Sequence, residues 1–277
     1  MSLASISFNK YSKVAIGAET RGKTAQNRLR RVDHFVIMYC PYLIMSDEHF
    51  YVDLGFGHTP ITTLESAKRF RQYNARLPIL LPLKVNAVTG RRETVNLIRA
   101  FNVLRQYDLE SDCRDSHAFI CNYLNVNGIL IEGTSDPWGR IWVANIIRKQ
   151  IDHSLLIEAL VFSTNFRDGF NIVSFQQVLP KNFIHRMTGS NEMIYNFFEH
   201  WRISYEQVGN SMKNIYGIGV RQQFIATAKH LAEEYGYHIM TDKKFLKNGF
   251  LIWLLKPGSR GVDIDQITYR TQSSRKK

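Results

Sequence analysis

Residues 49–73 place a short apolar segment, a glycine turn and a helical segment in direct succession. The apolar segment and turn read HFYVDLGFG, and residues 62–65 open the helical segment LESAKRFRQY. Glycine lets the main chain adopt positive φ and lets a ligand approach closely. In an open α/β sheet, ligands bind where a strand ends and the chain turns toward a helix. The segment therefore predicts an α/β fold with a ligand site at this turn.

Three further segments have the apolar runs of buried strands, at residues 94–101, 128–133 and 154–162. Helical patterns separate them. One helix is expected to begin at Asp136, with Pro137 in its first turn, and to continue through residues 140–151. Strands that alternate with helices predict a doubly wound, mainly parallel sheet.

Other helical patterns lie near the two ends of the chain. Leu29, Val32, Val36 and Cys40 share one helical stripe, and a helix is expected over 220–235, where Gly236 ends it. The segments 236–240 and 249–255 are expected to form paired terminal strands. Residues 180–220 are rich in aromatic residues and predict a helical insertion. We therefore expect one domain over 25–257, preceded by a basic arm at 1–24 and followed by a basic, disordered tail at 258–277.

The positive charge is concentrated at the ends of the sequence. The chain has 36 Lys and Arg against 24 Asp and Glu, a net charge of +12. Residues 1–31 carry a balance of +6 and residues 256–277 a balance of +4. Basic tails neutralise phosphates and release counterions, which favours RNA as a partner; solubilising tails explain the same pattern. Aromatic residues do not interleave with these charges, so any such binding is expected to be non-specific.

Several classes of protein are excluded by composition. Three cysteines at wide spacings form neither a disulfide framework nor a zinc motif, which is typical of a cytoplasmic protein. The longest apolar run, residues 35–45, has 11 residues and includes Pro41. A membrane-spanning helix needs about 20 apolar residues, so no membrane span is expected. The histidines do not pair at metal-ligand spacing, and no metal site is predicted.

The turn itself has the pattern D-x-G-x-G-x-T, formed by Asp53, Gly55, Gly57 and Thr59. A dinucleotide fingerprint needs G-x-G-x-x-G, which this turn does not supply. The turn resembles motif I of class I S-adenosylmethionine-dependent methyltransferases. Further blocks resemble, in the same order, those of an actinobacterial family of such enzymes. They lie at residues 20–35, 52–65, 90–108, 128–140, 183–187 and 219–231.

The resemblance implies a methyltransferase with S-adenosylmethionine as cofactor and an acceptor that it does not identify. It implies a Rossmann-like sheet in which the residues of the turn (Asp53, Gly55, Gly57 and Thr59) hold the donor. Phe101 and Asn102, which follow a strand, would face the reactive side of the cofactor, and Asn102 is a candidate to orient the acceptor. Glu132, at the end of the next strand, is a candidate catalytic carboxylate. Asn102 equally suits a residue that caps the turn after a strand.

The sequence departs from this class between residues 57 and 93. The class places an acidic residue at the end of its second strand to bind the ribose, and the strand candidate 78–85 ends without one. A helix and two strand-helix units need about 70 residues, and this stretch supplies 37. One unit is therefore expected to be missing. Either a compact variant binds adenosine differently, or the chain is a degenerate methyltransferase-like protein that binds RNA through its basic termini.

Overall fold

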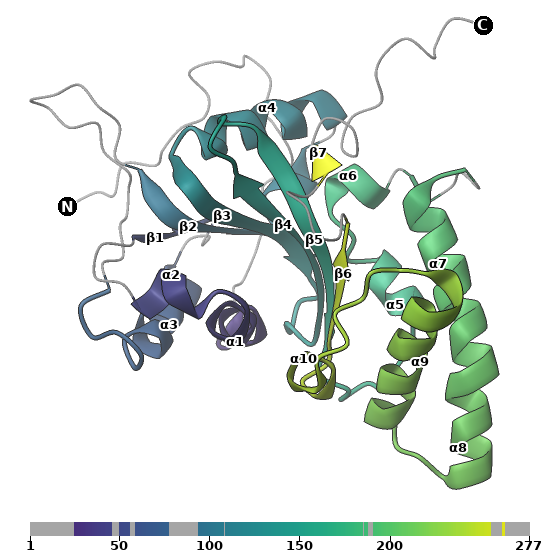
Figure 1. Ribbon diagram of the computed structural model, residues 1–277. Helices are drawn as coiled ribbons and strands as arrows, with labels where there is room; N and C mark the ends of the chain where they lie inside the picture. Colours follow the sequence, from purple (N-terminus) through teal and green to yellow (C-terminus); the bar gives the residue numbers. More distant parts are fainter. Residues whose placement is uncertain are drawn as a thin grey trace, which may run out of the picture.

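The protein folds around one mixed sheet with helices on both faces (Figure 1). The structure is a computed structural model. It describes residues 25–45, 50–55, 59–77, 94–107, 109–184, 186–187, 191–255 and 262–263. The strands are β1 (Tyr51–Leu54), β2 (Val95–Phe101), β3 (Leu124–Ser135), β4 (Ile141–Lys149), β5 (Leu155–Thr164), β6 (Phe250–Leu254) and β7 (Val262–Asp263). Strands and helices together confirm the α/β class.

The strand order is β1-β2-β3-β4-β5-β6, and β7 pairs with β5. β1, β2 and β3 are parallel, whereas β4 pairs antiparallel with both β3 and β5. β5 therefore runs in the same direction as the first three strands. These four strands end at one edge of the sheet, which we call the carboxyl edge.

The prediction of a mainly parallel sheet is wrong, because most strand pairs among the described residues are antiparallel. The cause is local. Residues 140–151, expected to be helical, contain β4 instead. Asp136-Pro137-Trp138-Gly139 has the residue preferences of a tight turn, with Asp first, Pro second and Gly fourth. The amide of Gly139 donates to the carbonyl of Asp136 at 3.2 Å, and the turn sends the chain back along β3.

Three N-terminal helices cover one face of the sheet, together with α10 (Lys243–Lys247) (Figure 1). They are α1 (Arg30–Tyr39), α2 (Pro41–Met45) and α3 (Ile61–Phe70). The predicted stripe of α1 is confirmed, because Leu29, Val32, Val36 and Cys40 are all buried. Phe35, from the same helix, packs edge-on against the ring of Trp142 on β4, with ring centroids 5.7 Å apart.

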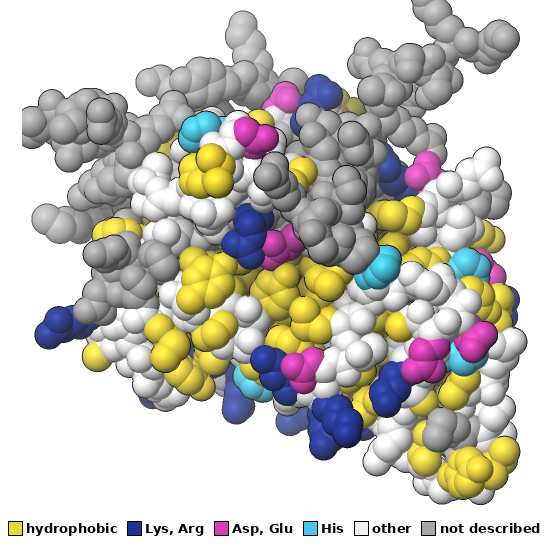
Figure 2. All heavy atoms as spheres, viewed as in Figure 1, with side chains coloured by type: hydrophobic (Ala, Val, Ile, Leu, Met, Phe, Trp, Pro, Cys, Tyr) yellow, Lys and Arg dark blue, Asp and Glu magenta, His cyan; other side chains and the backbone are white. Residues whose placement is uncertain are grey.

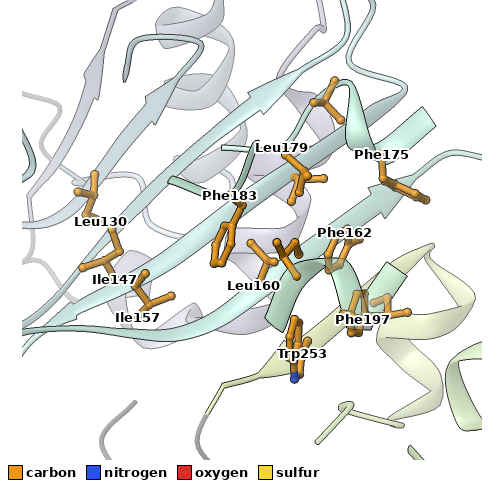
Figure 3. Close-up of a cluster of buried hydrophobic side chains, with 14 of the residues drawn as sticks. Leu130, Ile147, Ile157, Leu160, Phe162, Phe175, Leu179, Phe183, Phe197 and Trp253 are labelled. Atoms are coloured by element: carbon orange, nitrogen blue, oxygen red, sulfur yellow. The ribbon is translucent and has the colours of Figure 1, made fainter. Parts of the chain in front are cut away.

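The remaining helices lie on the opposite side of the sheet, and most of them bury residues in the core there (Figure 1). They are η2 (Leu104–Gln106), α4 (Glu110–Cys121), α5 (Val173–Gln176), α6 (Lys181–Ile184), α7 (Met193–Ser204), η3 (Tyr205–Asn210), α8 (Ser211–Tyr216) and α9 (Val220–Tyr235). Stacked aromatic rings fill the core beneath α7: Phe197 lies between Phe162 of β5 and Trp253 of β6 (Figure 3), with ring centroids 5.2 and 4.3 Å away. This burial explains the aromatic composition of residues 180–220.

The C-terminal predictions are confirmed in part. Gly236 adopts a φ of +67° and ends α9. Residues 249–255 contain β6, whereas the segment 236–240 contributes only the isolated bridge between Ile239 and Trp253. The segment between them contains α10.

Two parts of the sequence analysis lie outside the described residues. These are the basic ends, 1–24 and most of 258–277, and the segment 78–93, which includes the candidate second strand. The division into arm, domain and tail therefore stays a prediction. Within the described part of the chain, no helix has the length and apolar character needed to cross a membrane.

Candidate functional site

The carboxyl edge brings together the residues that follow β1, β2 and β3. Gly55 follows β1 directly, adopts a φ of +73° and is exposed. A Cβ atom at Gly55 would clash with the side chain of Val103, from the segment after β2. Conformation and packing therefore both require glycine here. One side of Gly55 is covered by Val103, while its main chain stays accessible to solvent.

Asn102 connects the ends of β2 and β3. It adopts a φ of +61°, and its amide donates to the carbonyl of Gly133 at 2.8 Å. Its side-chain Oδ1 accepts from the amide of Ser135 at 3.0 Å, and its Nδ2 donates to the Ser135 hydroxyl at 3.3 Å. These contacts satisfy the turn-capping interpretation of Asn102. They also fix the side chain at the edge, next to the segment that packs on Gly55.

Asp53 lies below the turn and is bound by a buried arginine. Arg99, on the neighbouring strand β2, donates from Nε to Asp53 Oδ1 at 3.0 Å and from Nη2 to Oδ2 at 2.6 Å. Thr63 of α3 donates its hydroxyl to the same Oδ2 at 2.7 Å. Both carboxylate oxygens are thus occupied by groups of the chain itself. Such paired contacts hold β1, β2 and the start of α3 in a fixed relation.

The same arginine reaches helix α1. Nη1 of Arg99 donates to Asp33 Oδ1, and Arg69 of α3 binds Asp33 Oδ2 at 2.5 Å. The Ser66 hydroxyl donates to Asp33 Oδ1 at 2.8 Å. We call Asp33, Asp53, Ser66, Arg69 and Arg99 the Arg99 network. Burial by itself lowers the pKa of Arg99, but the carboxylates, with Asp53 the larger contributor, raise it above its ordinary value.

Two other predicted donor-site residues, Thr59 and Phe101, make no contact with the Arg99 network among the hydrogen bonds of the described residues. Thr59 is exposed just before α3 begins, and Gly57 lies outside the described residues. The ring of Phe101 is buried beneath α1, edge-on to Trp142 at 5.8 Å. Only the main chain that follows Phe101 reaches the carboxyl edge.

Glu132 lies on the opposite face of the sheet from Asp53 and Phe101, in a second buried polar group. Its Oε2 accepts from Asn145 Nδ2 of β4 at 2.8 Å, and Asn145 also donates to Asn182 Oδ1 of α6 at 3.0 Å. His117 Nε2 of α4 lies 3.9 Å from Glu132 Oε2. We call these four residues the Glu132 cluster. Among the described residues, Glu132 Oε1 has no hydrogen-bond partner.

Burial sets the protonation of the Glu132 cluster. It raises the pKa of Glu132 to about 7, although the hydrogen bond from Asn145 opposes the rise. It lowers the pKa of His117 to about 4. Desolvation disfavours the charged form of each group. Near pH 6 both are neutral, so the cluster is a set of polar groups rather than an ion pair.

Sequence reasoning missed most residues of these two groups. Asp53 and Glu132 were named from the sequence, but Arg99 and Asn145 were not, although each interrupts a strongly apolar strand segment, in NLIRAF and WVANII. A polar residue within a buried strand requires a partner, and this is the signal that could have found them. The partners Asp33 and His117 carry no such signal, because they lie on helices distant in the sequence.

No protein-family model matches the sequence, and no curated protein matches it. Among solved structures, an S-adenosylmethionine-dependent methyltransferase from Clostridium acetobutylicum ATCC 824 is similar with a TM-score of 0.26 and 12% sequence identity. The alignment covers 48% of this chain and 65% of that protein, so the chain spans just under two thirds of its length. A similarity at this level carries no argument about function.

Proposed function

We propose that the chain is an S-adenosylmethionine-dependent methyltransferase whose acceptor is unidentified. One observation carries the proposal. An exposed glycine with positive φ directly follows a buried parallel strand, at the edge where two neighbouring strands also end. This edge is the ligand-binding position of open α/β sheets. The resemblance of the turn to methyltransferase motif I supplies the class of ligand.

The chain offers main-chain contacts and polar side chains to such a nucleoside. We assign donor binding to the main chain of Gly55 and Gly57, to Thr59, and to the main chain after Phe101. Asp53 acts as a positioning residue, because its carboxylate holds Arg99 and Thr63 rather than a ligand.

Bound S-adenosylmethionine would supply a methyl group on a sulfonium, which needs little activation beyond alignment with the acceptor. We assign this alignment to Asn102. Glu132 stays the candidate to take the proton that the acceptor loses, but it is 1% exposed and lies within β3, which continues to Ser135 instead of ending at Glu132 as expected. Glu132 faces α4 and α6, so its role in proton transfer requires the acceptor to enter from that side of the sheet.

Calorimetric titration of the full chain with S-adenosylhomocysteine tests the proposal. We expect saturable binding, and a loss of about tenfold or more for Gly55→Ala, because the added methyl displaces Val103 at the site. Gly169→Ala is the matched control, since Gly169 also has positive φ but open space around it. Thr59→Ala, at an exposed position, tests the site without a packing change. No heat and no thermal shift at millimolar ligand would refute donor binding.

The alternative is a methyltransferase-like protein without catalysis that binds RNA through residues 1–24 and 258–277. It stays a prediction, because those ends lie almost wholly outside the described residues. Deleting both ends should weaken RNA binding if they carry it, and should leave S-adenosylhomocysteine binding unchanged.

A further inference from the structure

A groove of about 970 Å³ lies on the α1 side of the sheet. Helices α1 and α3 line it, together with the turn between β3 and β4 and the segment after β5. The last two follow the ends of β3 and β5, so the groove begins at the carboxyl edge. Figure 2 shows several Lys and Arg side chains along the lower margin of this view, with Asp, Glu and His side chains among them.

The charges that line the groove are nearly all positive. Six basic side chains, Arg30, Arg31, Lys68, Arg69, Arg140 and Arg167, line it against the single carboxylate Glu65. We call it the basic groove. Arg30 and Arg31 belong to the basic stretch 1–31, whereas Lys68, Arg69, Arg140 and Arg167 come from the interior of the sequence, so the fold adds four cations to that stretch.

Three of the six cations are available to a ligand. Arg69 and Arg140 are held in ion pairs with Asp33 and Asp168. Arg30, Lys68 and Arg167 are exposed, and their side chains make no hydrogen bond or ion pair to the described residues. They come from α1, α3 and the segment after β5, and so from different walls of the groove.

The pKa of His34 is sensitive to the positive charges that line the groove. Burial lowers the pKa of His34 first, and the nearby charges of Arg31 and Arg30 lower it further. Arg31 is half-buried, and its Nη2 donates to the Ser163 hydroxyl at 3.0 Å and to the carbonyl of Asn248 at 2.6 Å, which holds the guanidinium in the groove wall. These fixed cations favour an anionic occupant.

Two exposed aromatic side chains accompany the cations. Trp138, on the turn between β3 and β4, is 66% exposed, and Tyr73, just after α3, is 56% exposed. The other three tryptophans are buried. The guanidinium of Arg140 lies 6.0 Å from the centroid of the Trp138 ring. Cations along a groove with exposed rings are the arrangement that binds a single nucleic-acid strand, because phosphates meet the cations and unpaired bases stack on the rings.

We propose that the basic groove binds single-stranded nucleic acid. Arg30, Lys68 and Arg167 neutralise phosphates, and Trp138 and Tyr73 stack on bases. The inference does not depend on methyl transfer, because none of these residues lies at the glycine turn. Failure of S-adenosylhomocysteine binding would leave it standing.

Fluorescence anisotropy of labelled 20-nucleotide strands with the full chain is the test, with oligouridylate and oligothymidylate as probes to separate RNA from DNA. We expect micromolar dissociation constants at about 0.1 M salt. Lys68→Gln/Arg167→Gln should weaken binding about tenfold. The control Lys213→Gln/Lys229→Gln removes the same charge from exposed positions on α8 and α9, and should change binding less than twofold.

Trp138 supplies a readout that charge alone does not give. Because it is the exposed tryptophan, base stacking should quench the intrinsic fluorescence of the protein, and Trp138→Leu should abolish the quenching and weaken binding about tenfold. Equal losses in the two charge variants would overturn the proposal, as would unchanged fluorescence. Equal or tighter binding of a duplex, or equal competition by polyglutamate, would also overturn it, since neither presents unpaired bases.

Discussion

Arg99 is the residue on which the arrangement around the glycine turn depends. It joins carboxylates from β1 and α1 and is itself buried. Arg99→Met removes the cation and leaves Asp53 and Asp33 buried with fewer partners. Removing one partner of a buried ion pair costs about 3 to 5 kcal/mol. We expect urea unfolding to show a loss of this size, against about 0.5 kcal/mol or less for Arg71→Met at an exposed position. An equal loss of unfolding free energy in Arg99→Met and Arg71→Met would contradict the stabilising role that we assign to Arg99.

Glu132 makes a prediction about pH. Its folded pKa of about 7 lies above the ordinary value of 4.5, so between these pH values the folded state keeps a proton that the unfolded state loses. This contribution makes stability fall as pH rises from 4.5 to 7. His117, with a folded pKa of about 4, acts in the opposite direction, and stability falls as pH drops below 6.5.

The contributions of Glu132 and His117 to stability oppose each other over nearly the same pH range. A variant is therefore needed to separate them. Glu132→Gln removes the first and can still accept from Asn145. Relative to wild type, its unfolding free energy should rise between pH 4.5 and 7, by an amount on the order of 3 kcal/mol. Urea unfolding at intervals across this range is the measurement. A pH-independent difference between the two proteins would show that Glu132 is ionised in the fold.

The sequence predicts the end of β2, but neither the full length of β3 nor which buried polar groups meet. Apolar runs mark strands locally, which placed Asn102 at the carboxyl edge. The contact between Arg99 and Asp33 joins residues 66 positions apart. No local pattern predicts such a contact, because it depends on how α1 packs across the sheet.

At the scale of elements, the turn between β3 and β4 decides the topology. An aspartate before a proline is a helix start in one context and a turn in another. The two interpretations differ in Gly139, whose φ of +65° belongs to the turn. The residues that follow, IWVANII, are mostly β-branched or apolar and suit a buried strand as well as a buried helix. Hydrophobic periodicity therefore does not distinguish a strand from a helix over these residues.

The same turn packs against the chain before α1. A Cβ atom at Gly139 would clash with the main-chain carbonyl of Arg28, and Arg28 in turn donates to the Ser135 hydroxyl and the Asp136 carbonyl. Gly139→Ala therefore meets both the positive φ and the clash. We expect it to lower the unfolding free energy by about 3 kcal/mol, against about 1 kcal/mol for Gly169→Ala, where the φ is positive and the space is open. Equal losses would mean that the turn does not touch this segment.

At the scale of the whole molecule, the net charge of +12 attracts any polyanion. Attraction alone therefore does not show where on the surface a nucleic-acid strand binds. Charge at a distance is screened over about 10 Å at 0.1 M salt, whereas a contacted phosphate releases counterions. Each neutralised phosphate of a single strand contributes about 0.7 to the slope of log affinity against log salt concentration. Lys68→Gln/Arg167→Gln should therefore reduce the slope by about 1.4.

The control variant Lys213→Gln/Lys229→Gln has the same net charge as the groove variant. Long-range attraction of a nucleic-acid strand is therefore reduced equally in the two proteins. If the strand lies in the basic groove, only the groove variant loses slope, and dissociation constants measured between about 50 and 200 mM salt will separate the two. If the basic ends carry the binding, both variants keep the slope of the wild type. Equal losses of slope in both would indicate that the whole surface, rather than the groove, collects the strand.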